Sequence, residues 1–159
     1  MNHSPHFPLR ATVIWPVMAS LPMLAPAVLA QGLPTGGRVT AGQAAIEAQG
    51  ASSLTIRQTS PKAVVRWNDF SIGAARSVTF AQPGSGAATL TIVDGGRAST
   101  LAGTLRANGS VLLVNPSGIA ITPTGRIDTQ AGFIASTLAI ADDDFLAGRY
   151  FFSGKGAGV

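Results

Sequence analysis

Beyond residue 50 the chain is built from short segments in which apolar and polar residues alternate, and turn-forming residues separate these segments. Alternation with a period of two is typical of strands that bury one face. The clearest segments are Ser53–Gln58, Ser77–Phe80 and Thr89–Ile92, and the turn markers between them include Ser60-Pro61 and Asp94-Gly95. Helical periodicity is almost absent after residue 30. The sequence therefore predicts an all-β fold.

The second half of the chain shows a regular spacing of apolar residues that limits the possible architectures to two. Its apolar positions fall seven to ten residues apart, with glycines between them, at Leu101, Val111, Ile119, Ile127 and Ile134. This spacing suits either an antiparallel sandwich or a solenoid of short parallel strands.

Two observations favour the solenoid. In the regularly spaced part, from Leu101 onward, the tight hairpin signature occurs only at Asn108-Gly109. The pentapeptide Ala98–Ala102 recurs letter for letter as Ala135–Ala139, 37 residues later. That interval corresponds to about two coils of a β-helix. We therefore expect a parallel β-helix and keep the sandwich as the alternative.

A solenoid begins with an open coil whose unpaired backbone groups and core must be covered. The stretch from Gly36 to Gln82 is spaced less regularly than the rest, and its large aromatic residues include Trp67 and Phe70. We expect this stretch to form an N-terminal cap, with Trp67 and Phe70 as its anchors. At the other end, residues 151–159 contain no closing polar cap, which indicates that the natural chain continues.

The first thirty residues have the order of a secretory signal peptide. Arg10 precedes an apolar stretch from Ala11 to Leu29, and Ala30 provides the small residue before the expected cleavage site. Four prolines between residues 16 and 34 interrupt this region, which argues against a membrane anchor. We expect residues 1–30 to be removed, so that the mature chain begins near Gln31.

Removal of the leader leaves no histidine, and the whole chain has no cysteine. Nucleophile–histidine catalysis and histidine-rich zinc sites are then excluded. No carboxylate pair is specified for glycosidic chemistry. The run Asp142–Asp144 lacks the further oxygen ligands of a calcium loop, and we expect it to begin a short helical turn before Phe145. The basic residues lack interleaved aromatic platforms and do not indicate nucleic-acid binding. The sequence predicts no enzyme, no cofactor and no metal.

The sharpest local motif is Asn115-Pro116-Ser117-Gly118. Asn at the first position can bond its own backbone, Pro presets φ at the second, and Gly fits the fourth. The motif predicts a rigid type I β-turn between strands at 111–114 and 118–121. It is also our candidate for recognition by a partner.

Several segments, taken in order, resemble one known family. They are Leu54–Gln58, Ala63–Gly73, Val78–Pro83, Ser99–Gly109, Val111–Ile119 and Ala135–Leu138, followed by Phe145. In this order and spacing the chain resembles the haemagglutination-activity domain of two-partner secretion exoproteins, such as filamentous haemagglutinin and the high-molecular-weight adhesins. The resemblance runs from about Leu33 to Phe152.

The resemblance implies a right-handed parallel β-helix with an N-terminal capping region. It divides the chain into a signal peptide at 1–30 and a two-partner secretion (TPS) domain at 31–159, with the cap and first strands at 33–82 and the coils at 83–159. Two departures from the family stand out. Ser117 replaces a common Asn, which still suits the turn. Leu90–Val93 replaces a frequent Leu-Asn-Arg-Val and so lacks the Asn-Arg pair that a partner contact there would use.

The resemblance further implies export through two membranes. The Sec machinery would act on the signal peptide, and the POTRA domains of an outer-membrane barrel transporter would recognise the domain in the periplasm, with residues 115–118 as a secretion motif. The coils would then nucleate β-helix folding of the downstream passenger, an adhesin at the cell surface or in the medium. The alternative function is a free-standing secreted module that binds glycans or host cells.

Overall fold

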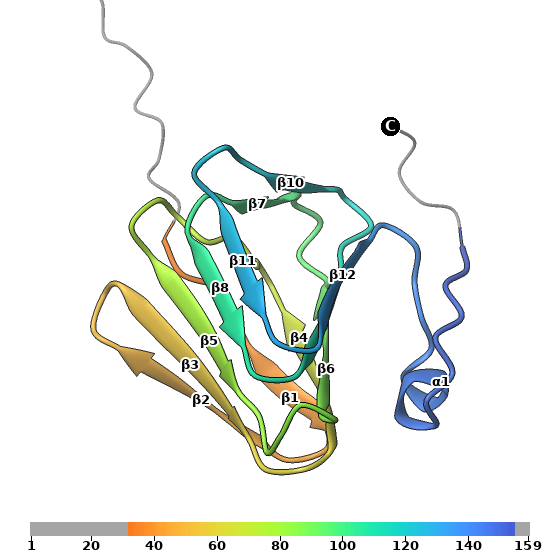
Figure 1. The fold of residues 1–159 in the computed structure, drawn as a ribbon. Helices are drawn as coiled ribbons and strands as arrows, with labels where there is room; N and C mark the ends of the chain where they lie inside the picture. The colour runs from red at the N-terminus through yellow and green to blue at the C-terminus, as the bar shows by residue number, and fades with distance from the viewer. Residues whose placement is uncertain (1–31, 155–159) are drawn as a thin grey trace, which may run out of the picture.

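Residues 32–154, the part of the chain that the computed structural model describes, wind into a parallel β-helix with three faces (Figure 1). Two faces are five-stranded sheets, in the orders β11-β8-β5-β3-β2 and β1-β4-β6-β9-β12, and the third is the pair β10-β7. The described elements are β1 (Arg38–Ala41), β2 (Ala44–Gln49), β3 (Ser53–Gln58), β4 (Lys62–Trp67), β5 (Ser77–Ala81), β6 (Ala88–Val93), β7 (Ser99–Leu101), β8 (Thr104–Ala107), β9 (Ser110–Val114), β10 (Ile119–Ile121), β11 (Arg126–Thr129), β12 (Gly132–Ser136) and α1 (Asp142–Leu146).

Each coil contributes one strand to each large sheet in turn. Parallel register pairs Ser53 with Ser77, Ser77 with Thr104, and Thr104 with Arg126, so equivalent positions lie 24, 27 and 22 residues apart. On the neighbouring sheet the last two intervals are both 22 residues. The expected parallel β-helix is therefore confirmed, and the antiparallel sandwich is not formed.

Antiparallel strands close the N-terminal end of the β-helix. β2 pairs with β3 and β1 pairs with β4, both antiparallel, so the two open edges of the first coil are covered. The residues before β1 continue this cover, because Thr35 exchanges backbone hydrogen bonds with Asn68 and Asp69 at N···O distances of 2.9–3.3 Å. An N-terminal capping region is therefore present, but it ends with β2, and the rest of the expected stretch, from Ser53 to Gln82, belongs to the coils.

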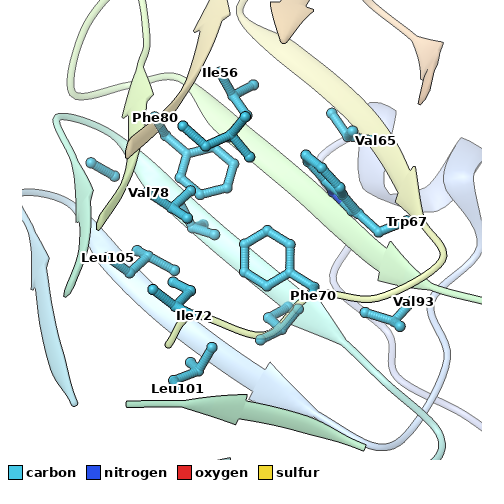
Figure 2. Close-up of a cluster of buried hydrophobic side chains, with 14 residues drawn as sticks. Ile56, Val65, Trp67, Phe70, Ile72, Val78, Phe80, Val93, Leu101 and Leu105 are labelled. Carbon is cyan, nitrogen blue, oxygen red and sulfur yellow. The ribbon is translucent and has the colours of Figure 1, made fainter. Parts of the chain in front are cut away.

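The interior of the β-helix is filled by the inward side chains of all the coils. Because neighbouring parallel strands stack about 4.8 Å apart, equivalent side chains form rows, such as Val65, Thr91 and Leu113. Figure 2 shows aromatic residues of the first two coils at the centre of this core. The buried cluster comprises Leu54, Ile56, Val65, Trp67, Phe70, Ile72, Val78, Phe80, Val93, Leu101, Leu105, Ala107, Val111 and Leu113.

A second apolar cluster lies on the outer side of the β4-β6-β9 sheet. The segment Ala139–Ser153, which we name the strap, passes over this face and carries α1 (Figure 1). Both faces of β6 are therefore covered, and all six of its residues are buried. The outer cluster comprises Val64, Ala88, Leu90, Ile92, Leu112, Val114, Ile140 and Phe145, with Ala41 and Phe152 packed against it.

Two sequence interpretations need correction. The repeated pentapeptide does not mark equivalent positions, because Ser99 lies in β7 whereas Ser136 ends β12, and 37 residues is not a multiple of the coil length. Asn108-Gly109 is no hairpin, since it joins β8 to β9 in different sheets. The short helix at Asp142–Leu146 forms as expected.

The expected signal peptide, residues 1–30, lies outside the described residues. Among residues 32–154, no helix is long and apolar enough to cross a membrane.

Candidate functional site

The Asn115–Gly118 turn lies at the corner where the third coil passes from β9 to β10. The Gly118 N–H donates to the Asn115 carbonyl at 3.0 Å, and the Ser117 N–H donates to Asn115 Oδ1 at 2.9 Å. The first bond closes a β-turn, and the second is an Asx turn. Gly118 has φ +114°, a value that favours glycine. The β-turn is formed where the sequence predicts it.

The Asn115 side chain is fully buried and satisfied within the fold. Its Nδ2 donates to the Arg97 carbonyl at 2.8 Å and to Ser99 Oγ at 2.9 Å. Its backbone N–H donates to the Ser136 carbonyl at 3.0 Å. Arg97 and Ser99 belong to the coil before Asn115, and Ser136 belongs to the coil after it. One asparagine therefore joins three successive coils.

The exposed part of the motif is smaller than the motif itself. Pro116 and Ser117 are exposed, whereas Asn115 is buried and Gly118 is half-buried. A protein that recognises the folded turn would therefore contact Pro116 and Ser117. The Asn115 side chain would be within its reach only before the coils stack.

The two aromatic residues expected as cap anchors lie together in the core of the first coil. Trp67 ends β4, Phe70 follows in the loop, and their ring centroids are 5.3 Å apart in an edge-to-face arrangement (Figure 2). Phe70 in turn lies 6.3 Å from the ring of Phe80. The indole N–H of Trp67 is buried without a hydrogen-bond partner in the described part. The role of the Trp67 side chain is therefore apolar packing.

The capping strands rest directly on this aromatic pair. A Cβ atom built at Gly37 would lie 2.5 Å from Cζ3 of Trp67 and 2.8 Å from Cδ1 of Ile46. Glycine therefore lets the backbone before β1 lie against the indole face. Trp67 and Phe70 come from the coil, and the cap contributes the surface that packs on them.

Sequence reasoning missed a buried amide ladder at the corner between the two large sheets. Thr89 Oγ1 donates to Gln58 Oε1, Gln82 Nε2 donates to Thr89 Oγ1 at 3.0 Å, and the Gly109 N–H donates to Gln82 Oε1 at 2.7 Å. Gln82 also exchanges two backbone–side-chain bonds of 2.7 Å with Asn108.

A sequence signal for this ladder exists. Amide residues lie at the end of the first strand of each coil or directly after it, at Gln58, Gln82, Asn108 and Gln130, at intervals of 24, 26 and 22 residues. These intervals match the coil lengths closely.

Charged side chains gather around the strap. Arg66 donates to both carboxylate oxygens of Asp142 at 3.2 Å and to Asp94 at 3.3 Å. Burial alone would lower the pKa of Arg66, but the hydrogen bonds and negative charges of Asp142 and Asp94 outweigh it and raise the pKa. Asp144 accepts from Arg149 at 2.6 Å. Within residues 32–154, no group of three or more His, Cys, Asp or Glu side chains could hold a metal ion.

A shallow pocket of about 290 Å³ opens on the outer face of β5, β8 and β11. Its lining combines the polar side chains of Thr79, Arg106, Asn108, Asp128 and Gln130 with apolar surface from Phe80, Ala81 and Ala107. This face contrasts with the outer face of the other large sheet, which is apolar and covered by the strap.

Comparison with known proteins gives relatives that share this architecture. The crystal structure of the HMW1 secretion domain from Haemophilus influenzae superposes with a TM-score of 0.67 at 33% identity, over 72% of this chain and 30% of that chain. A heme/hemopexin-binding protein of Haemophilus influenzae is 39% identical over 108 residues, which cover 68% of this chain and 12% of that protein. A second protein of that name and species is 43% identical over 96 residues, 60% of this chain and 10% of the relative.

The chain thus spans only about a tenth of the length of these curated relatives. The family model described as the TPS secretion domain matches residues 30–158, nearly all of the chain after the expected leader. This is a family of secretion domains from adhesin and heme-binding exoproteins and not a family of enzymes. The β-helix, its antiparallel cap and this match together show that the chain belongs to the TPS secretion domains of two-partner secretion exoproteins.

Proposed function

We propose that this chain directs a longer exoprotein through an outer-membrane transporter whose POTRA domains bind it in the periplasm, after the Sec machinery has acted on residues 1–30. The match to the TPS secretion domain over residues 30–158 carries this proposal. The proposal needs no cofactor and assigns no reaction to the domain. An adhesin at the cell surface is the passenger that the family resemblance favours.

The two ends of the β-helix support a second part of the proposal, in which the domain nucleates folding of its passenger. The first coil is covered by antiparallel strands, whereas β11 and β12 stand at sheet edges in the described part. Apolar residues of the last coils remain partly or largely exposed, among them Ile121, Ile127 and Ile134. Since each coil of a solenoid templates the next, a following coil would cover them.

The secretion experiment compares release of the chain into the medium with and without the cognate transporter. We expect release only when the transporter is present. Equal release from both strains would contradict the proposed function. Periplasmic accumulation without the transporter serves as the control for signal-peptide processing.

The turn motif is tested by variants that separate surface contact from folding. Pro116→Ala and Ser117→Ala change exposed residues, so stability should stay within about 1 kcal/mol of the parent. If the transporter reads the folded turn, these variants should reduce secretion. Unchanged secretion by both variants, with loss only in Asn115→Ala, would assign the motif to folding.

The second candidate function is binding of glycans or host cells, and the pocket on β5, β8 and β11 favours it. Arg106, Asp128 and Gln130 offer donors and acceptors of the kind that polyhydroxylated ligands require. Saturable binding to a glycan array that Arg106→Ala abolishes would support this function. Haem binding, which the names of the relatives mention, is not proposed for this segment, because residues 32–154 contain no His, Cys or Met and their tyrosine, Tyr150, stacks on the Phe145 ring.

A further inference from the structure

The strap, Ala139–Ser153, is attached to the β-helix through side chains. Within the described residues, every hydrogen bond that joins a backbone N–H to a backbone carbonyl of the strap lies inside the strap. Ala139 and Ser153 exchange two such bonds of 2.8 and 3.1 Å, and the others belong to α1 and the turn after it. The last backbone bond to a coil is the one accepted by the Ser136 carbonyl. The strap can therefore leave without breaking any sheet hydrogen bond.

Side-chain contacts hold the strap in place, and Ile140 and Phe152 of the strap pack in the outer cluster together with Phe145. The Phe145 ring is fully buried against the outer cluster. Lys62 Nζ donates to the carbonyls of Phe145 and Leu146 at 2.9 and 3.1 Å. Arg66 binds the Asp142 carboxylate. Lys62 and Arg66 both belong to β4, so these contacts connect the end of the described chain to the first coil.

The surface under the strap exists only after several coils have stacked. Val64 of β4, Leu90 of β6 and Leu112 of β9 form one register row, with one residue from each of three coils. The polar contacts join residues 76 to 84 positions apart. Contacts of such long range form late, because the entropy of closing the loop is offset only once the intervening chain is ordered.

The strap also lacks intrinsic structure. α1 has five residues and no side-chain hydrogen bond at its N-cap, Ala141. Isolated helices of this length are not stable in water. The strap thus gains its conformation from the surface on which it packs.

We propose that the strap is the last element to dock, and that before it docks the apolar row beneath it is bound by the periplasmic part of the transporter. This inference rests on the proposed function and adds a way in which binding to the transporter is regulated. Docking of the strap would cover the apolar row and so release the domain from the transporter. The strap shows the chemistry of the occupant: an amphipathic segment with an aromatic side chain for the Phe145 position, an acidic one opposite Arg66 and carbonyl oxygens facing Lys62.

Hydrogen exchange of the unaltered protein is the first test. Amides of residues 139–153 should exchange at least about tenfold faster than those of β4, β6 and β9, because the strap opens locally while the coils stay closed. Equal protection of strap and coils would overturn the inference. This measurement requires no variant and no transporter.

A matched pair of variants tests the attachment. Phe145→Ala removes the buried ring, whereas Leu146→Ala shortens the neighbouring exposed side chain of the same helix. We expect Phe145→Ala to speed exchange of the strap at least about tenfold, to leave exchange of the coils unchanged and to bind at least about threefold more of a dye that reports exposed apolar surface. Leu146→Ala should behave like the parent. Loss of coil protection in Phe145→Ala would show that the strap is integral to the β-helix and would overturn the inference.

The third test measures affinity for the purified periplasmic fragment of the transporter. Phe145→Ala should bind at least about fivefold more tightly than the parent, since the strap no longer competes for the apolar row. Equal affinity of the two proteins would refute competition while leaving the secretion role intact. Absence of binding by both proteins, together with transporter-independent release, would instead remove the proposed function on which the inference depends.

Discussion

At the scale of single residues, the proposed secretion motif, Asn115–Gly118, combines a buried amide with an exposed tip. Asn115 is buried and bonded to Arg97, Ser99 and Ser117, whereas Pro116 faces solvent. The same four-residue turn thus contains a residue that stabilises the stack of coils and residues that a partner can touch. Loss of function in an Asn115 variant therefore does not by itself identify a contact.

Asn115→Ala should destabilise the protein by about 2–4 kcal/mol, because it leaves the Ser117 N–H and the Ser99 hydroxyl without their buried partner. Urea denaturation followed by circular dichroism measures this loss. Ser117→Ala is the control and should stay within about 0.5 kcal/mol of the parent. A similarly small effect at Asn115 would contradict the structural role assigned to its side chain.

Gly37→Ala should destabilise the protein by about 1–3 kcal/mol, because the added methyl group would enter the space of the Trp67 ring. Gly86→Ala is a matched control, since a Cβ atom there meets nothing within 4 Å. Thermal unfolding of both variants provides the comparison. If Gly37→Ala unfolds at the temperature of the control, the close contact between cap and tryptophan is not a determinant of stability.

At the scale of elements, the two large sheets differ in what covers their outer faces. The β4-β6-β9 sheet has apolar side chains on both sides and is covered by the strap, so its strands read as nearly continuous hydrophobic runs. In the β3-β5-β8 sheet, buried residues alternate with more exposed ones along each strand, and the polar outer face is left uncovered. Ile92, which stands where the family often has Arg, points outward under the strap beside Leu90, which matches the family. The departure at Ile92 therefore adds apolar surface for the strap.

Gln82→Leu should cost about 2–4 kcal/mol, because the amide ladder between the sheets would lose the partner of the Gly109 N–H and of Thr89. Gln130 occupies the corresponding corner of the last described coil and is exposed. Gln130→Leu is therefore the control and should change stability by no more than about 0.5 kcal/mol. Equilibrium denaturation of the two variants distinguishes them. Equal effects would mean that the buried ladder contributes nothing beyond the size of the side chain.

At the scale of the whole molecule, the β-helix is asymmetric along its axis. One end is closed by antiparallel β1 and β2, and the exposed large apolar side chains of the described part all come after residue 120. Such an arrangement stops strand addition at the first coil and leaves the last described coil available for stacking.

Deletion of residues 32–49 removes both capping strands and should convert the protein into an associating species. The edges of β3 and β4 and the face of Trp67 would become exposed, and exposed edges pair with other chains. Size-exclusion chromatography should show oligomers where the parent elutes as a monomer. A monomeric, cooperatively folded deletion variant would show that the first coil needs no cover.

Particular residues show how far sequence reasoning extends. Alternation in Ser53–Gln58 and the turn chemistry of Asn115–Gly118 are local properties, and both elements formed where they were expected. The pentapeptide repeat was misleading, because identical residues need not occupy equivalent positions in successive coils. The better signal was the recurrence of Gln58, Gln82, Asn108 and Gln130, whose intervals follow the coils.

The sequence by itself determined the strands, their turns and the family, because alternation, turn propensity and motif order are encoded within a few residues of each other. Only the tertiary structure decided that Asn115 faces inward, that Lys62 and Arg66 hold the strap, and which sheet face is covered. These outcomes depend on contacts between residues that are up to 84 positions apart. Such contacts depend on how the coils stack, and no local pattern in the chain specifies them.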